Sequence, residues 1–169
     1  FAGHCHGKEP AQMKISAEQL TIREAQERDI PALAAIYAAD KVGSHGDTTD
    51  PEALADYSRA FDAIAASPNE SLYVVELEGE IVGTFQTVIL NKLVGRGSVS
   101  MAMEAVQTRS DMRGQGIGAI MVDYCIDKAK KLDIGTVQLV SNVARLDAHR
   151  FYERLGFERR HFGFRMKLK

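Results

Sequence analysis

The sequence has little of what marks secreted, membrane or nucleic-acid-binding proteins. It has only two cysteines, Cys5 and Cys125, far apart in the chain, and we therefore expect a reducing, cytoplasmic setting. No run of eighteen apolar residues occurs, so we expect no transmembrane helix and no membrane partner. The first residues lack the apolar core of a signal peptide. A formal net charge of −2 argues against a general nucleic-acid surface, which would need a large basic excess.

Length and composition predict one globular domain over residues 14–169. The chain has 169 residues, 45% of them hydrophobic and 26% charged, which is typical of a soluble domain that can bury a core without cross-links. Residues 1–13 differ, because they show no periodicity, and we expect an extension that is vector-derived or poorly packed. The triplet His4-Cys5-His6 in this extension is too short for a structural zinc site, and we predict no metal.

Apolar periodicity and turn residues predict the order of the elements. The expected strands are 20–23, 72–77, 81–90, 98–108 and 136–141, followed by a final hairpin of 157–160 and 164–168. The expected helices start at Asp29, as an N-cap before Pro31, and at Asp50, and two more cover 118–131 and 146–155. This order predicts an α/β fold with a mixed, mostly antiparallel central sheet flanked by helices.

The helix 118–131 has a wide apolar stripe, which predicts that it is largely buried. Cys125 falls in this stripe, so we interpret it as a core residue and not as a nucleophile.

A glycine-rich loop joins the long strand 98–108 to this helix. Strand, glycine-rich loop and helix together aim unpaired N–H groups, and the positive end of the helix dipole, at an anion. No Lys-Ser/Thr pair follows, as a Walker A loop would require, and the glycine spacing does not fit the dinucleotide fingerprint. Taken alone, the loop fits a tight turn without a ligand equally well. Its residues are Arg113, Gly114, Gln115, Gly116, Ile117 and Gly118.

Two motifs in this order resemble the GNAT superfamily of N-acetyltransferases. The family's pyrophosphate loop reads Arg/Gln-x-x-Gly-x-Gly/Ala, which residues 113–118 match with an extra leading glycine. Residues 148–157 are similar to the family's Ala-x-x-Phe-Tyr-x-x-x-Gly-Phe, and 103–108 to its fourth strand. The likeness runs from about residue 20 to the end, and the resemblance implies a GNAT-like fold and activity.

The resemblance implies acetyl-CoA as co-substrate, bound between the fourth and fifth strands. The backbone of Val106 and Thr108 is then expected to pair with the pantetheine arm. The family often has an asparagine that contacts CoA seven residues before the tyrosine, but this chain has Arg145 there. We therefore assign the CoA contact to Asn142. For Arg145 two readings stay open: a functional residue, or a solvated arginine at the start of the helix. The expected phosphate-binding residues are Arg113, Gly114, Gln115, Gly116, Ile117, Gly118 and Ala119.

Amine acetylation needs a base, because an alkylamine with a pKa of about 10.4 is protonated at neutral pH. Glu104 is our candidate base, directly or through water, because strand periodicity puts it on one small, polar face with Val106 and Thr108. The alternative is a structural or edge glutamate. The resemblance makes Tyr152 the candidate acid for the CoA thiolate, against a plain core aromatic. His149 shares its helix face, and we interpret it as a satisfied histidine.

The acceptor is expected to be a primary amine in a small molecule, an amino acid or a peptide, attacking in a ternary complex. Acidic residues between 40 and 52 suit a cationic amine, while Arg159, Arg160 and His161 suit a carboxylate. Dimers are common in the resembling family, so a homodimer is expected. Two alternatives stay open: a CoA-binding regulatory module without turnover, and a nucleotide-phosphate binder that uses the same loop.

Overall fold

The computed structural model describes residues 14–42 and 46–168. The predicted extension 1–13, with its His4-Cys5-His6 triplet, lies outside the described residues. The strands are β1 (Leu20–Glu24), β2 (Glu70–Leu77), β3 (Glu80–Asn91), β4 (Val99–Thr108) and β5 (Thr136–Leu139). The helices are α1 (Ile30–Ala38), α2 (Leu54–Ala66), α3 (Val94–Gly97), α4 (Ile117–Lys131) and α5 (Leu146–Arg154), and short 3-10 turns precede β1, α1, α2 and α4.

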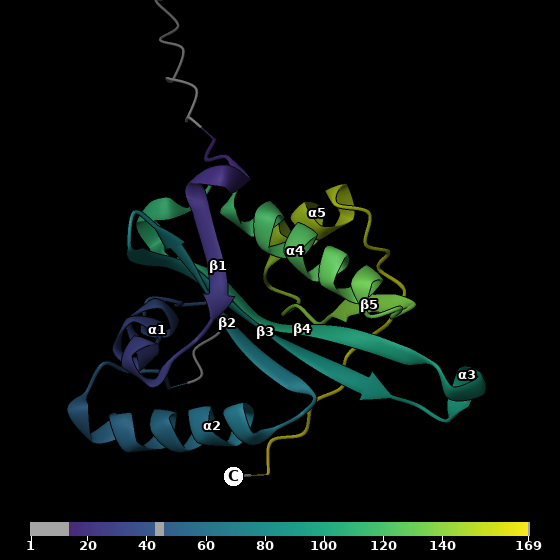
Figure 1. Ribbon diagram of the computed structural model, residues 1–169, viewed down its shortest axis with the longest axis horizontal. Coiled ribbons are helices and arrows are strands. Elements are labelled where there is room, and N and C mark those ends of the chain that lie inside the picture. Colours follow the sequence, from purple (N-terminus) through teal and green to yellow (C-terminus); the bar gives the residue numbers. More distant parts are fainter. Residues whose placement is uncertain (1–13, 43–45, 169) are drawn as a thin grey trace, which may run out of the picture.

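The sheet is mixed and mostly antiparallel, as predicted. The strands lie in the order β1-β2-β3-β4-β5; the first three pairings are antiparallel and β4–β5 is parallel. In Figure 1 the sheet runs through the centre, and β3 and β4 continue beyond it as an arm that ends in the turn α3. The parallel pair follows from the helical crossover through α4, which returns the chain in the direction of β4.

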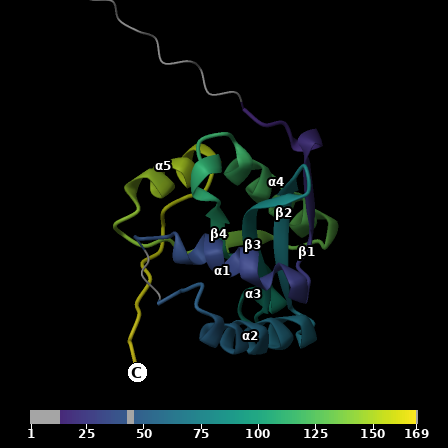
Figure 2. The ribbon, with the colours of Figure 1, turned by 90° about the vertical axis from the view of Figure 1, so that its left-hand side faces the viewer.

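Helices cover both faces of the sheet. Figures 1 and 2 show α1 and α2 on one side and α4 on the other, with α5 beside α4. The predicted stripe of α4 is buried against the sheet, and burial of Cys125 raises the pKa of its thiol to about 12, as expected for a core residue. The buried cluster between sheet and α4 contains Tyr73, Val75, Val82, Phe85, Met101, Met103, Ile117, Met121, Val122, Cys125 and Ala129.

Strand β4 contains a one-residue bulge at Ala105. Gln86 pairs with Glu104, but Thr84 pairs with Gln107, so β4 has one more residue than β3 over this stretch. Ala105 has a φ of 49°, which is uncommon for a residue with a Cβ and marks the bulge.

The bulge reverses the predicted side-chain alternation after Glu104. The expectation that Glu104, Val106 and Thr108 share a face is wrong, because the extra residue shifts the alternation by one. Gln107 now lies on the face of Glu104 and bonds to Asp40, two residues after the end of α1, while Val106 packs against the α4-side core. The residues that share the Glu104 face of β4 therefore differ from those that periodicity predicts.

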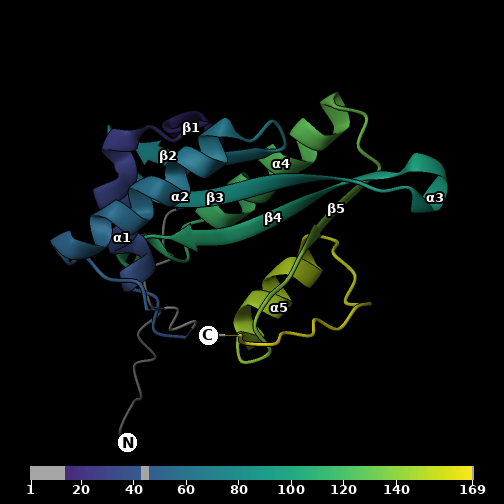
Figure 3. The ribbon, with the colours of Figure 1, turned by 90° about the horizontal axis from the view of Figure 1, so that it is seen from below.

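The predicted final hairpin is also wrong. Residues 158–168 form no strand, and the predicted strand 136–141 ends at Leu139. The segment passes β5, since a Cβ on Gly163 would lie 3.4 Å from Val140 Cγ1, but it joins no ladder. Figure 3 shows it leaving α5 as an extended trace. Its alternating apolar residues, which suggested a strand, are exposed: Phe162, Phe164, Met166 and Leu168.

A saturated arginine cluster joins β1, β2 and the start of α1. Asp29 stands at the N-cap position, as predicted, but its side chain does not cap the helix and accepts from Arg23 and from the Gln26 amide instead. Arg23 uses all three guanidinium nitrogens, on Asp29, Glu76 and the Glu24 carbonyl. No helix within the described residues is long and apolar enough to cross a membrane.

Candidate active site

The loop before α4 has the geometry of an anion site. Gly116 is the N-cap of the 15-residue helix α4, with a φ of 93° that only glycine adopts readily, and no described side chain caps the helix. A Cβ on Gly116 would meet only the Ile15 carbonyl oxygen, at 3.8 Å, so no described side chain lies within 4 Å of that point. The loop is tied down at Gln115, whose carbonyl accepts from the Ile15 amide at 2.9 Å. These features fit a phosphate group, as the sequence predicts.

Gly118 also has a packing role that the sequence does not reveal. A Cβ at this position would lie 3.1 Å from Phe151 Cζ, so the missing side chain lets α5 lie close against α4. Arg113 is exposed, and its Nε donates to the Thr108 carbonyl at 3.3 Å, which places the guanidinium between the end of β4 and the loop.

Tyr152 is half-buried between aromatic neighbours. Its ring packs edge-on against Phe151 and Phe157, at centroid distances of 5.0 and 5.8 Å. Burial raises the pKa of the Tyr152 phenol above its ordinary value, and the positive charge of Arg145 opposes part of this rise. No described residue hydrogen-bonds to the hydroxyl, so it can donate a proton to a bound group.

Glu104 is exposed on the α1/α2 side of β4. Its partner across the strands is Gln86, whose amide donates to Glu70 at 3.3 Å. No hydrogen bond or ion pair engages the Glu104 carboxylate within the described chain, so this carboxylate is open to solvent and to a ligand. Glu70 is a second carboxylate in this neighbourhood, and the sequence analysis did not identify it.

A buried carboxylate links three segments beside this face. Asp40 accepts from Gln107 Nε2 at 2.9 Å and from Arg145 Nη2, and its other oxygen accepts from the Val42 amide at 3.2 Å. Burial raises the pKa of Asp40, but the hydrogen bond and charge of Arg145, with the other two donors, outweigh burial and hold the pKa below its ordinary value. Asp40 is therefore an anionic anchor between α1, β4 and α5.

Asn142 lies in the exposed loop between β5 and α5. Its side-chain oxygen accepts from the Ala144 amide at 2.9 Å, and its backbone carbonyl lies 2.9 Å from His149 Nε2. Because a carbonyl only accepts, His149 donates here through Nε2. Its buried Nδ1 has no hydrogen-bond partner among the described residues, so the interpretation of His149 as a fully satisfied histidine is wrong. The side-chain NH₂ of Asn142, an exposed residue, has no partner among the described residues.

The charges expected to bind the acceptor do not form one cluster. Asp47 accepts from the Tyr57 hydroxyl at 3.0 Å, Arg160 pairs with Glu158, and only Asp40 of the acidic segment meets an arginine. His45 lies outside the described residues. Arg159 and His161 are exposed in the segment that forms no strand.

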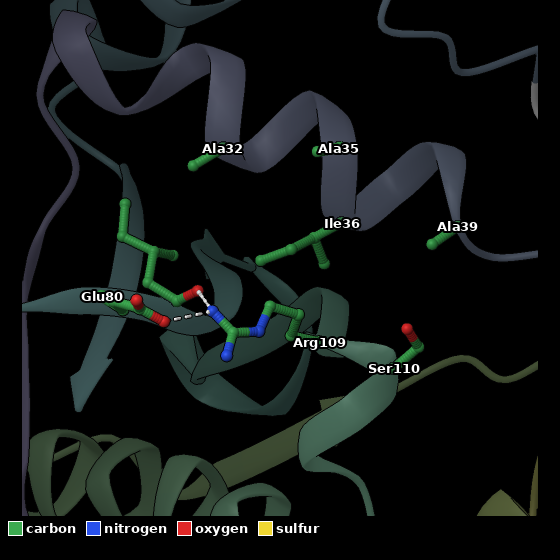
Figure 4. Close-up of a pocket in the computed structure, with 8 residues that line it drawn as sticks. Ala32, Ala35, Ile36, Ala39, Glu80, Arg109 and Ser110 are labelled. Carbon is green, nitrogen blue, oxygen red and sulfur yellow. Dashed lines mark hydrogen bonds and ion pairs between the residues drawn. The ribbon is translucent and has the colours of Figure 1, made fainter.

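A cavity of about 370 Å³ lies elsewhere, between α1 and the ends of β3 and β4 (Figure 4). Arg109 crosses its floor, fully paired with Glu80, Asp111 and the Ile81 carbonyl, and neither Glu104 nor Tyr152 lines it. In the part of the chain that the structure describes, no group of three or more His, Cys, Asp or Glu could hold a metal.

Comparison with known proteins agrees with this geometry. Residues 30–157 match the acetyltransferase (GNAT) family, and the chain belongs to that family. An aminoalkylphosphonate N-acetyltransferase of Salmonella typhimurium is 31% identical over 64% of this chain and 72% of its own length. An L-methionine sulfoximine/L-methionine sulfone acetyltransferase of Pseudomonas paraeruginosa is 33% identical over 82% and 80%. The crystal structure of a transcriptional regulator from Bacillus halodurans is 37% identical, with a TM-score of 0.84 over 88% of this chain and 99% of that one.

The predicted family and fold are thereby confirmed, and the named relatives support an acetyltransferase. The family's donor substrate is acetyl-CoA, and the open helix N-terminus of this chain fits its phosphates. The roles of the individual residues stay predictions. Sequence reasoning missed Gln107 and the pairing of Asp40 with Arg145, because no local pattern joins two residues that lie 105 positions apart.

Proposed function

We propose that the protein transfers the acetyl group of acetyl-CoA to a primary amine of a small molecule, an amino acid or a peptide, in a ternary complex. The observation that carries this proposal is the uncapped N-terminus of α4, with its left-handed Gly116, in a chain of the acetyltransferase family. The two acetyltransferases above support it, since one is named an N-acetyltransferase and the other acts on amino-acid analogues according to its name.

The loop and the first turn of α4 would hold the phosphates of CoA. The amides of Gln115, Gly116, Gly118 and Ala119 would donate to phosphate oxygens, and Arg113 would add a charge beside them. The backbone of Val106 and Thr108 would pair with the pantetheine arm, and the free NH₂ of Asn142 would contact it from the β5 side. The bound donor supplies an activated acetyl thioester.

Glu104 would accept the proton of the acceptor ammonium. At neutral pH an alkylamine is almost wholly protonated, so deprotonation must accompany attack. Because Glu104 is exposed, a water molecule can carry the proton between amine and carboxylate. The amide of Val106, in the bulged part of β4, would donate to the oxygen on which negative charge develops.

Tyr152 would return a proton to the departing thiolate. Its raised pKa keeps the phenol protonated across the neutral range, and no described residue competes for its hydrogen. A phenol is a better proton donor than water for this step.

Thermal unfolding with acetyl-CoA, CoA and ATP, each added separately, tests the proposal. A ligand that binds only the native state must stabilise it, so both CoA species should raise the unfolding temperature by several degrees. No shift at saturating CoA would remove the cofactor assignment, and a shift with ATP alone would favour the nucleotide-binding alternative. An assay of released thiol across a panel of amines then measures turnover.

One observation favours a CoA-binding regulatory module without turnover as the second candidate function. The similar Bacillus halodurans structure is described as a transcriptional regulator. Stabilisation by CoA with no thiol release from any amine would select this alternative. The homodimer and the cytoplasmic setting stay predictions.

A matched pair of variants at Gly116 isolates the phosphate contact. Both Gly116→Asn and Gly116→Asp place a side chain at a positive φ, which asparagine and aspartate tolerate better than most residues. Only the aspartate adds negative charge. We expect Gly116→Asp to abolish CoA stabilisation and Gly116→Asn to retain more of it, and equal affinity in both variants and the wild type would reject the loop as the phosphate site.

A further inference from the structure

Arg145 differs from Arg23 and Arg109 in how many of its guanidinium nitrogens are hydrogen-bonded to the protein. Arg23 and Arg109 each engage all three guanidinium nitrogens with protein oxygens. Arg145 engages only Nη2, on Asp40, and no described residue accepts from its Nε or Nη1. With 26% of its side chain exposed, Arg145 keeps most of its N–H donors available to a ligand.

The guanidinium of Arg145 is nevertheless held in place. Its partner Asp40 is a nearly buried carboxylate, with a side chain only 7% exposed, and both Gln107 and the Val42 amide fix it. A charged group anchored at one edge and open at the other is pre-organised for binding, since little side-chain freedom is lost when a ligand arrives.

The position of Arg145 points to the reacting end of the site. Arg145 is the N-cap of α5, and Tyr152 lies seven residues further along in this helix. Through Asp40 it is also connected to Gln107, which the bulge places on the same face of β4 as Glu104. Arg145 is therefore joined through Asp40 and Gln107 to the face of β4 that carries the candidate base, and it precedes the helix that carries the candidate acid.

We propose that Arg145 binds an anionic group, a carboxylate or a phosphonate, carried by the acceptor amine. The planar guanidinium presents paired N–H donors that match two oxygens of such a group. This inference rests on the proposed function and narrows its acceptor to amines that also bear an acid. The relatives agree with it in chemistry, because aminoalkylphosphonates and methionine derivatives both combine an amine with an acidic group.

Three amines that share an ethylamine unit test the inference: 1-aminoethylphosphonate, alanine and ethylamine. Thiol release would be measured for each at saturating acetyl-CoA. We expect kcat/KM for at least one of the two acid-bearing amines to exceed that for ethylamine by about 10- to 100-fold, as charge-assisted hydrogen bonds at a partly exposed site allow. The two acid-bearing amines then tell which oxyanion is preferred.

Variants separate an acceptor role of Arg145 from a cofactor role. Arg145→Gln should lower kcat/KM for the acid-bearing amines by about 10- to 100-fold, through KM, and change ethylamine by little. Arg145→Lys, which keeps the charge but loses the planar pair of donors, should fall between. Arg150→Gln is the matched control, because it removes an exposed arginine from α5. It should leave unchanged the ratio of kcat/KM for the acid-bearing amines to kcat/KM for ethylamine.

Several results would overturn the inference. One is equal efficiency with alanine, 1-aminoethylphosphonate and ethylamine in the wild type. Another is a rise in KM for acetyl-CoA in a folded Arg145→Gln protein with the acid-to-neutral ratio unchanged, which would place the guanidinium on the cofactor. Acetyl-CoA binding without acetylation of either acid-bearing amine would also overturn it. By contrast, absence of acetyl-CoA binding would remove the proposed function itself.

Discussion

Arg23 and Arg145 both lie against a buried aspartate, yet the fold uses them differently. Around Arg23 every donor finds an oxygen, and Asp29, which is 4% exposed, is fully enclosed by Arg23 and the Gln26 amide. Around Arg145 the carboxylate of Asp40 is satisfied, but the guanidinium is not. The first cluster joins segments of the fold, whereas the second leaves binding capacity at a site. Counting unused donors thus separates charges that stabilise the protein from charges available to a ligand.

The largest expected effect is on stability, from the saturated cluster. Asp29→Ala leaves Arg23 with Glu76 as its only carboxylate, and loss of the charge-assisted hydrogen bonds to Asp29 should cost about 2–3 kcal/mol. Urea unfolding would measure it, with the exposed pair Asp56–Arg59 as control, where Asp56→Ala should cost less than about 0.5 kcal/mol. If Asp29→Ala lowers the free energy of unfolding by less than about 1 kcal/mol, the Arg23 cluster is not a stabilising one and its contrast with Arg145 fails.

The next effect is on turnover, from an open carboxylate. Glu104→Gln should lower kcat about 100-fold at neutral pH, spare the affinity for acetyl-CoA and leave stability nearly unchanged. The deficit should shrink as pH rises, because more of the amine is then already neutral. Glu70→Gln changes the neighbouring carboxylate that Gln86 engages, and it is the matched control. An unaffected rate in Glu104→Gln, or an equal loss in Glu70→Gln, would remove Glu104 from its assigned role.

Two tyrosines extend the comparison to hydroxyl groups. Tyr152→Phe keeps the ring packing against Phe151 and Phe157, so we expect normal stability and a turnover about 10- to 100-fold lower. Tyr57→Phe should instead lower stability and leave turnover unchanged. The Tyr57 hydroxyl is hydrogen-bonded to Asp47 and to the Thr48 amide, so its loss should cost about 1 kcal/mol of unfolding free energy. Full activity in Tyr152→Phe would mean that Tyr152 is a core aromatic residue and not the acid of the reaction.

The smallest effect separates anchoring from folding. Asp40→Asn should cost about 1–2 kcal/mol at neutral pH, less than Asp29→Ala, and should raise KM for acid-bearing acceptors because Arg145 loses its anchor. The folded-state pKa of Asp40 is lowered, so its stabilising contribution is present above its ordinary pKa and is lost as pH falls through the lower folded value. Urea unfolding at several pH values should therefore show the two proteins converging below about pH 4.

The sequence predicted the parts that local chemistry determines. The glycines around Gln115 and the apolar stripe of α4 each need only neighbouring residues, so the loop, the helix and the buried Cys125 could all be predicted. The order of most elements along the chain and the mixed, mostly antiparallel sheet followed from turn residues and apolar periodicity. These features depend on backbone geometry and on side-chain period, both of which can be read directly from the chain.

Other features depend on contacts that no local pattern encodes. Ala105 is an ordinary residue with a positive φ, so nothing in the strand pattern announces the bulge that moves Gln107 to the face of Glu104. The meeting of Asp40 with Arg145 needs the complete fold. The alternation from Phe162 to Leu168 predicts a strand, but a strand also needs a partner edge, and these residues have none within the described chain.

The hydrogen bond from the Ile15 amide to the Gln115 carbonyl gives the chain ahead of β1 a direct connection to the glycine-rich loop that we propose binds phosphate. An amide proton exchanges with solvent only when its hydrogen bond opens, so the exchange rate at Ile15 reports how often this loop opens. Occupation of the helix N-terminus beside Gln115 would slow that exchange from outside the site. Ile15 is thus a natural isotope-exchange sensor for cofactor binding, readable without any label on the ligand or any catalytic turnover.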